Sequence, residues 1–410
     1  MTGKLLLVIP AVLEDSPQEI LADEHFGHNL RAYLAEFDQV TVACPSMPAK
    51  SPNMVPVDSI AGSEKCRTII LPEPYREDRY LRQRGRISRL LREEIDRADY
   101  LLISPHASFE WSTLATRVAI AMGRDYNMES DWNLPNVVRS QLREMPLGLN
   151  RIRKTLWHWS HQRVYFDSLR SSRLSLLQGA AVFDAYKDIA PNPHKVLNVQ
   201  VTEADRLPDA DYAAKLERVR SGATLRILYT GRVIPMKGPD DWQKALHHAF
   251  ANGLRGAANW FGDGDLIEPM RRGAADRGFA DRVAYPGNVE RSEVFARMRE
   301  ADLFLFCHLT DESPRCLVES LTAATPIVGF ASLYACDLVA ERGGGAFVDI
   351  GDWRALGDLL VGLDQDRERL ARLIEQARDS SLLYDREQAI QQRIRLMRQH
   401  LRPPLRKAGN

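Results

Sequence analysis

Short apolar runs alternate with amphipathic stretches along most of the chain. Runs of this kind are typical of buried parallel strands, and the stretches between them have the spacing of helices. In the first half we predict strands at residues 4–10, 39–43, 67–71, 100–104, 174–177 and 196–200, and helices at 24–36, 76–98 and 108–122. Residues 136–170 are predicted to form one long or broken helix, interrupted at Pro146 and Gly148.

The second half repeats this alternation. We predict strands at residues 225–230, 258–262, 283–285, 303–307, 327–330 and near 346–350, and helices at 239–251, 266–277, 292–301, 315–323 and 386–401. Strands that alternate with helices predict an α/β fold built on doubly wound parallel sheets. Because 410 residues exceed what one hydrophobic core normally holds, we expect two domains with a boundary near residue 200.

The composition is that of an ordinary globular protein. Hydrophobic residues make up 44% and charged residues 27%, and the formal net charge of zero gives no sign of a nucleic-acid partner. Five scattered cysteines without ligand spacing favour a reducing compartment over disulfides or zinc. With no apolar run near the ~20 residues that span a bilayer and no signal-peptide order, we expect a cytoplasmic protein, soluble or peripheral to the inner face of the membrane.

Two segments of the first half are basic. Residues 76–97 carry eight arginines, and residues 139–173 carry eight Arg and Lys against two acidic residues. These segments are either solvated helix faces or a basic rim that meets an anionic membrane or a phosphorylated acceptor. The nearby Trp157 and Trp159 fit a membrane-bound acceptor, and they fit a core aromatic stripe equally well.

The strongest chemical signal is the segment 311–319, DESPRCLVE, which follows a predicted strand and enters a predicted helix. We expect Ser313 to cap this helix and Pro314 to lie in its first turn. The free N–H groups at a helix N-terminus favour anions, so this end of the helix is a candidate site for a diphosphate. The amides concerned are those of Arg315, Cys316 and Leu317.

Carboxylates surround the same helix start. Asp311, Glu312 and Glu319 are candidates to bind the hydroxyl groups of a sugar or ribose. Glu319 is flanked by apolar residues and needs a partner, which is either a ribose diol or a nearby arginine.

Three other loops follow predicted strands of the second half. Arg232 and Lys237 offer a planar fork and a point charge, which suit two adjacent phosphates, although a plain surface loop explains them too. Gly262 and Asp263 allow a tight turn near a ligand, although a plain strand-to-helix connector explains them too, and the main chain at Asn288 and Val289 is placed to meet the edge of a flat ring. These two loops are the predicted nucleobase side of the site.

Together these residues resemble the retaining GT-B glycosyltransferases of the family 4 type (glycosyltransferase group 1), over residues from about 225 to about 350. The resemblance implies two Rossmann-like domains that face each other across a cleft. Residues 1–200 would form the acceptor-side domain, residues 201–380 the nucleotide-sugar-binding domain, and residues 381–410 a helix that packs back on the first domain. It also implies a nucleoside diphosphate sugar as donor, with no cofactor and no metal.

The resemblance assigns roles in the donor site. Arg232 and Lys237 resemble the diphosphate-binding pair of the family, and Glu319 resembles the second glutamate of its E-x7-E motif, which holds the ribose. Strict spacing puts the first glutamate of that motif on Asp311, with Glu312 one position away. We favour Glu312 as the carboxylate near the sugar.

The first domain departs further from the family pattern. Its candidates are His106, which follows a predicted strand, and the cluster Glu129-Ser130-Asp131. Asp131 loosely resembles the polar residue that the family places under the reacting carbon, whereas a structural role for His106 stays open. The predicted catalytic set is Asp131, His106 and Glu312.

The sequence therefore predicts a retaining hexosyltransferase that acts on a glycan, a lipid-linked acceptor or a small molecule, in the synthesis of cell-surface polysaccharide or glycoconjugate. Two alternatives stay open. One is a nucleotide-sugar epimerase of the same architecture, and the other is a non-catalytic nucleotide-sugar-binding scaffold.

Overall fold

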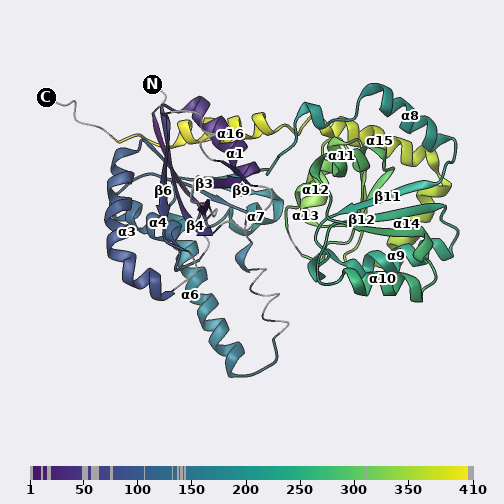
Figure 1. The fold of residues 1–410 in the computed structure, drawn as a ribbon, viewed down its shortest axis with the longest axis horizontal. Helices are drawn as coiled ribbons and strands as arrows, with labels where there is room; N and C mark the ends of the chain where they lie inside the picture. Colours follow the sequence, from purple (N-terminus) through teal and green to yellow (C-terminus); the bar gives the residue numbers. More distant parts are fainter. Residues whose placement is uncertain are drawn as a thin grey trace. The chain divides into compact units, whose positions relative to one another are not determined.

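The chain divides into two compact units (Figure 1). Unit 1 comprises Met1–Leu197 and Glu387–Asn410, and unit 2 comprises Asn198–Arg386. The structure is a computed structural model, and it describes residues 3–404 except 11–12, 16–19, 49–53, 57–63, 74–76, 106, 132, 136–137, 139–141, 143–144 and 311.

Among its described residues, unit 1 is built on a sheet of ten strands. These are β1 (Lys4–Val8), β2 (Leu13–Asp15), β3 (Ile20–Asp23), β4 (Gln39–Pro48), β5 (Met54–Pro56), β6 (Cys66–Leu71), β7 (Tyr100–Ile103), β8 (Asn127–Ser130), β9 (Leu174–Gln178) and β10 (Pro193–Val196). The order is β10-β9-β8-β7-β1-β4-β2-β3-β5, and β6 pairs with β4 off this path. All pairs are parallel except β2–β3 and β3–β5.

Helices cover both faces of this sheet. They are α1 (Glu24–Glu36), α3 (Glu77–Arg97), α4 (Trp111–Ala121), α6 (Leu149–Ser171), α7 (Gly179–Tyr186) and α16 (Arg386–His400). Successive side chains of a strand point to opposite faces. Leu6 and Val8 of β1 accordingly join the core beneath α3 and α4, whereas Leu5 and Leu7 join the core beneath α1 and α16. The last helix of the chain therefore completes the core of unit 1.

Unit 2 contains six parallel strands, in the order β13-β12-β11-β14-β15-β16. The strands are β11 (Leu225–Thr230), β12 (Gly256–Phe261), β13 (Val283–Gly287), β14 (Leu303–Phe306), β15 (Ile327–Phe330) and β16 (Gly345–Val348). The helices are α8 (Asp209–Arg220), α9 (Pro239–Ala251), α10 (Ile267–Asp276), α11 (Arg291–Glu300), α12 (Arg315–Thr322), α13 (Leu333–Val339), α14 (Trp353–Gln365) and α15 (Arg367–Ser381).

The strand order of unit 2 reverses beside β11. The chain runs outward from β11 to β12 and β13, then returns to place β14 on the other side of β11. In open α/β sheets such a reversal leaves a crevice at the carboxyl ends of the two central strands, where ligands bind. The loops after β11 and β14 are therefore the first place to look for a site.

The predicted elements of the second half are confirmed to within two residues. The strand predicted at residues 196–200 is wrong, because the pairing of β10 with β9 ends at Val196. Strand β8 was not predicted. The break expected at Pro146 and Gly148 is confirmed, because both residues lie outside regular helix and α6 begins at Leu149 with Gly148 as its N-cap. Within the part of the chain described, no helix is both long and apolar enough to cross a bilayer.

Candidate functional site

The loops that follow β11 and β14 meet at the reversal of strand order. Lys237 ends the short 3-10 helix η2 (Pro235–Lys237) after β11, and Glu312 lies in the loop after β14. The lysine Nζ and the glutamate Oε1 are 2.7 Å apart. Lys237 is buried and Glu312 is partly buried, so this ion pair is screened less by solvent than a surface pair.

Close backbone contact between the two loops requires a glycine. Gly238 has φ +64°, in the left-handed region that favours glycine, and a Cβ there would lie 2.0 Å from the carbonyl oxygen of Cys307. The Leu309 amide also donates to the Met236 carbonyl, at 2.9 Å. These contacts fix the loops against each other and hold Lys237 beside Glu312.

Two further side chains stand at this point, and sequence reasoning missed both. The Tyr229 hydroxyl lies 2.8 Å from Nε2 of His308, and Nδ1 of His308 lies 3.9 Å from Oε1 of Glu312. Burial and the nearby Lys237 hold the pKa of His308 well below its usual value, so the ring is neutral. The sequence feature that could have pointed to His308 was its position just after the apolar strand β14.

Helix α12 starts at Arg315, as predicted, but its N-cap is not the residue expected. Pro314 itself occupies the N-cap position, with Arg315 as the first helical residue, so the expected capping role of Ser313 is wrong. Pro314 has φ −71° and ψ 125°, an extended conformation, so it precedes the helix instead of lying in its first turn. The Leu317 amide donates to the Pro314 carbonyl at 3.3 Å, whereas Arg315 and Cys316 lie in the first turn, where amides lack intrahelical acceptors.

Glu319 lies one turn further along α12 and is partly buried. Burial raises the pKa of its carboxyl group, and the charges of Arg315 and Arg291 oppose that rise. Its apolar neighbours Leu317 and Val318 are fully buried. From the sequence, the partner of Glu319 was either a ribose diol or an arginine. Arg315 and Arg291 are the two arginines close enough for the second role.

The other predicted donor-site residues are distributed around this centre. Arg232 is exposed and lies near the start of the loop that ends in Lys237. Cys316 is partly buried, and burial raises the pKa of its thiol to about 12, so it stays protonated at neutral pH. Asp311 lies outside the described residues.

The loops predicted to face the nucleobase form one edge with the loop after β11. The Gly231 amide donates to the Phe261 carbonyl at 2.9 Å, and the Gly262 amide donates to the Gly287 carbonyl at 2.8 Å. A Cβ on Gly262, where φ is +132°, would lie 2.1 Å from the Gly231 carbonyl oxygen. The residues at which these loops begin are therefore in direct contact. Asp263 and Asn288 follow them in the loops and are exposed.

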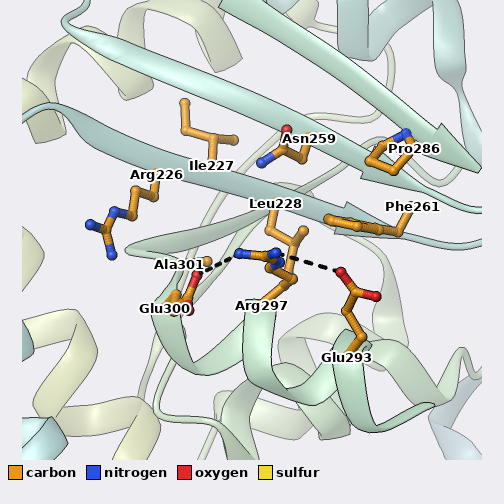
Figure 2. Close-up of a pocket in the computed structure, with 10 residues that line it drawn as sticks. All are labelled: Arg226, Ile227, Leu228, Asn259, Phe261, Pro286, Glu293, Arg297, Glu300 and Ala301. Carbon is orange, nitrogen blue, oxygen red and sulfur yellow. Dashed lines mark hydrogen bonds and ion pairs between the residues drawn. The ribbon is translucent and has the colours of Figure 1, made fainter. Parts of the chain in front are cut away.

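Unit 2 has a hollow of about 310 Å³ at the side of α11. Figure 2 shows ten residues that line it. Phe261 and Pro286, which precede the two nucleobase-side loops, lie at one end of it. Arg297 of α11 forms ion pairs with Glu293 (3.5 Å) and Glu300 (3.1 Å) at its rim. Lys237, Glu312 and Glu319 do not line this hollow, so it is separate from the centre between β11 and β14.

Unit 1 has a hollow of about 270 Å³ at the carboxyl ends of its central strands. Glu129, Ser130 and Asp131 line it together, and Asp131 is exposed. Glu129 accepts hydrogen bonds from Gln178 (3.0 Å) and from Arg393 of α16 (3.0 Å). His106 lies outside the described residues, so its predicted place beside this cluster stays a prediction.

Comparison with known proteins agrees with this architecture. Residues 217–380 match the family model described as glycosyl transferases group 1. The chain is 26% identical over 282 residues to a GDP-mannose-dependent alpha-(1-6)-phosphatidylinositol monomannoside mannosyltransferase of Mycobacterium tuberculosis. That alignment covers 66% of this chain and 66% of the relative, just under two thirds of the relative's length.

Solved structures resemble the chain over nearly its whole length. Anabaena HepE in complex with UDP has a TM-score of 0.69 at 15% identity, covering 97% of this chain and 100% of HepE. WaaG, a glycosyltransferase involved in lipopolysaccharide biosynthesis, has a TM-score of 0.64 at 13% identity, covering 96% and 99%. The predicted α/β fold with two parallel-sheet Rossmann-like domains is therefore confirmed, and its structural neighbours are GT-B glycosyltransferases.

Proposed function

We propose that the protein is a glycosyltransferase that moves a sugar from a nucleoside diphosphate sugar to an acceptor hydroxyl, with retention of the anomeric configuration. The observation that carries the proposal is the placement of Lys237 beside Glu312 where β11 and β14 diverge. A cation for a phosphate and a carboxylate for a sugar hydroxyl are thus side by side, next to the first turn of α12.

The chemistry needs charge stabilisation more than a strong base. As the bond between the anomeric carbon and the β-phosphate oxygen breaks, negative charge develops on the departing diphosphate. Lys237, Arg232 and the first-turn amides of α12 would stabilise that charge electrostatically. The acceptor oxygen forms the new bond to the anomeric carbon, and its proton passes to the departing phosphate.

The names of related proteins support nucleotide donors. The mycobacterial relative is named for GDP-mannose and a phosphatidylinositol-linked acceptor, and HepE was solved with UDP. We therefore propose UDP- and GDP-sugars as donors, and a glycan or lipid-linked acceptor in cell-surface polysaccharide or glycoconjugate synthesis. Asp131, beside Glu129 in the unit 1 hollow, is the proposed acceptor-side residue.

A transfer assay with UDP-, GDP- and ADP-sugars and a panel of acceptors tests the proposal. The double variant R232A/K237A should lose transfer, whereas K244A, which removes a lysine from the i,i+4 pair with Asp240 on α9, should keep it. Full activity in the double variant would refute the assignment. Epimerised donor without acceptor would identify an epimerase, and binding without turnover would identify a scaffold.

Two finer features have their own measurements. Nuclear magnetic resonance of the product distinguishes retention from inversion at the anomeric carbon. Among the described residues no cluster of three His, Cys, Asp or Glu side chains is placed to hold a metal ion. We propose that transfer does not need a metal, so activity should survive dialysis against a chelator.

A further inference from the structure

Helix α6 of unit 1 carries a concentration of exposed apolar side chains. Of the thirteen large hydrophobic residues that are exposed among those described, six lie between positions 147 and 159. The others are scattered over both units. Folded soluble proteins rarely expose contiguous apolar surface of this kind unless it binds something.

These side chains form a stripe along one side of the helix. Leu149, Ile152, Leu156 and Trp159 follow spacings of three, four and three residues, which place them on one face. Their exposed fractions are 79%, 57%, 63% and 62%. We call these four residues the α6 stripe.

In the N-terminal half of α6 the opposite face is polar and turned inward. His158 and His161 are each only 6% exposed, and burial lowers the pKa of His158. A helix of a soluble domain normally buries its apolar face and exposes its polar one. The N-terminal half of α6 is therefore inverted, and its apolar face lacks cover from the described part of the chain.

Positive charge accompanies the stripe. No acidic residue occurs between Met145 and Phe166, whereas Arg151, Arg153, Lys154 and Arg163 all fall in that interval. Arg153 and Arg163 are exposed, and Arg151 and Lys154 are partly exposed. Figure 1 shows this half of α6 extending beyond the strands of unit 1.

We propose that the α6 stripe docks onto an anionic lipid bilayer and holds the protein at the membrane surface. Helices that lie in the lipid headgroup region combine Leu, Ile and Trp on one side with Lys and Arg beside them. Long basic side chains keep their charge in the headgroups while their stems lie along apolar surface. This inference does not depend on the donor site of unit 2.

The basic residues around the α6 stripe favour a bilayer over a second copy of the chain as its partner. Two copies meeting through the α6 stripe would bring Arg153 and Arg163 of each copy together with no acidic partner from the same segment. Anionic lipids instead attract each basic residue near the surface. The stripe and its charges therefore fit a lipid surface better than they fit themselves.

Vesicle sedimentation tests the proposal with the full chain. The probes are vesicles of phosphatidylcholine alone and of phosphatidylcholine mixed with phosphatidylglycerol. We expect binding to the mixed vesicles that weakens with salt, and little binding to the neutral ones. I152S/L156S/W159S should bind at least about tenfold more weakly, as should R153Q/K154Q/R163Q, because interfacial binding combines apolar burial with attraction to anionic lipid.

A matched control separates the stripe from general hydrophobicity. L81S/L382S removes two exposed leucines that lie elsewhere, and its vesicle binding should equal that of the wild type. All variants change exposed or partly exposed residues, so their thermal unfolding midpoints should stay close to that of the wild type. Bromine-labelled lipid should quench tryptophan fluorescence in the wild type and less in W159F.

Several outcomes would overturn the proposal. One is wild-type protein that binds neither kind of vesicle. Another is a stripe variant that binds as well as L81S/L382S. Light scattering that shows a dimer in solution, made monomeric by I152S/L156S/W159S, would assign the stripe to a second copy of the chain instead.

Discussion

The Nζ atom of Lys237 lies 2.7 Å from Oε1 of Glu312, although 75 residues separate the two along the chain. The two loops that carry them follow neighbouring parallel strands, β11 and β14, which the chain visits far apart in sequence. This pairing puts a cation and a carboxylate where the phosphate and the sugar of one donor would be adjacent.

Replacing Glu312 by glutamine should separate sugar transfer from nucleotide binding. A hydrogen bond to a charged group contributes about 1.5–3 kcal/mol, so loss of the carboxylate should slow transfer roughly 10- to 100-fold. Binding of free UDP or GDP should stay the same or tighten, because Lys237 loses a competing anion. Steady-state transfer rates and calorimetric binding of the nucleotide measure the two effects.

The control for E312Q is E293Q, which neutralises a glutamate paired with Arg297 on α11. That exposed pair should contribute less than about 1 kcal/mol, and both transfer and binding should be unchanged. A contrary result would be tenfold weaker nucleotide binding by E312Q with unchanged turnover of bound donor. Glu312 would then support binding of the phosphates rather than of the sugar.

Gly238→Ala should destabilise the loop that positions Lys237. A Cβ would clash with the Cys307 carbonyl oxygen at 2.0 Å, and the residue has φ +64°. Strain of this kind costs of order 1–3 kcal/mol before the clash is added. Gly222→Ala has a similar φ of +76° in open space, so a larger fall in the unfolding midpoint for G238A than for G222A isolates the contact. Equal falls would show that the loops need no close approach.

Lys215 should make the stability of unit 2 depend on pH. Its buried Nζ donates to the Ala324 carbonyl (2.9 Å) and to the Thr325 hydroxyl (2.8 Å), and burial lowers its pKa from 10.5 to about 7. Between pH 7 and pH 10.5 the unfolded state therefore holds more protons than the folded state, so stability rises with pH across that window.

Between pH 7 and pH 9, Lys215 should raise the free energy of unfolding by about 2 kcal/mol. Urea unfolding of K215M should lack it, and K244M, which removes a lysine in a surface ion pair, should retain it. Parallel stability curves for K215M and the wild type would show that Lys215 titrates near its usual pKa.

Arg393 of α16 should stabilise unit 1 through its contact with Glu129, which lines the unit 1 hollow. This buried guanidinium donates from Nε to Glu129 (3.0 Å) and from Nη2 to the Leu197 carbonyl (2.8 Å). Removing one partner of a buried ion pair typically costs 3–5 kcal/mol, and we expect about 3 kcal/mol for R393M because Glu129 is not wholly buried. R395M changes an exposed arginine two positions away and should be neutral in the same denaturation measurement. Similar losses in both variants would assign the effect to the helix rather than to the pair.

Local signals were sufficient to predict most of unit 2. The predicted helix 239–251 coincides with α9, because Gly238 and Pro239 mark its start within the sequence itself. Strand β8 was missed because Asn-Met-Glu-Ser has no apolar pattern, and Asn127 is buried only because β8 pairs with β7 and β9.

The candidate site was predictable in kind but not in arrangement. The residue types at Arg232, Lys237 and Glu319 pointed to phosphate and ribose from sequence alone. The contact of Lys237 with Glu312, and the presence of His308 between Glu312 and Tyr229, depend on β14 returning beside β11. Likewise, Trp159 belongs to an exposed face rather than to the core stripe considered from the sequence, because α6 turns His158 inward.

The most direct test of the central claim, that Lys237 binds the diphosphate of the donor, is calorimetric titration of nucleoside diphosphate and of the matching nucleoside. UDP with uridine, and GDP with guanosine, are each titrated into wild type, K237M and K244M. We predict that K237M loses about tenfold or more of its affinity for the diphosphate, as expected for a hydrogen bond to a charged group, and none for the nucleoside. Equal diphosphate affinity in K237M and K244M, or a proportionate loss of the nucleoside, would contradict the account.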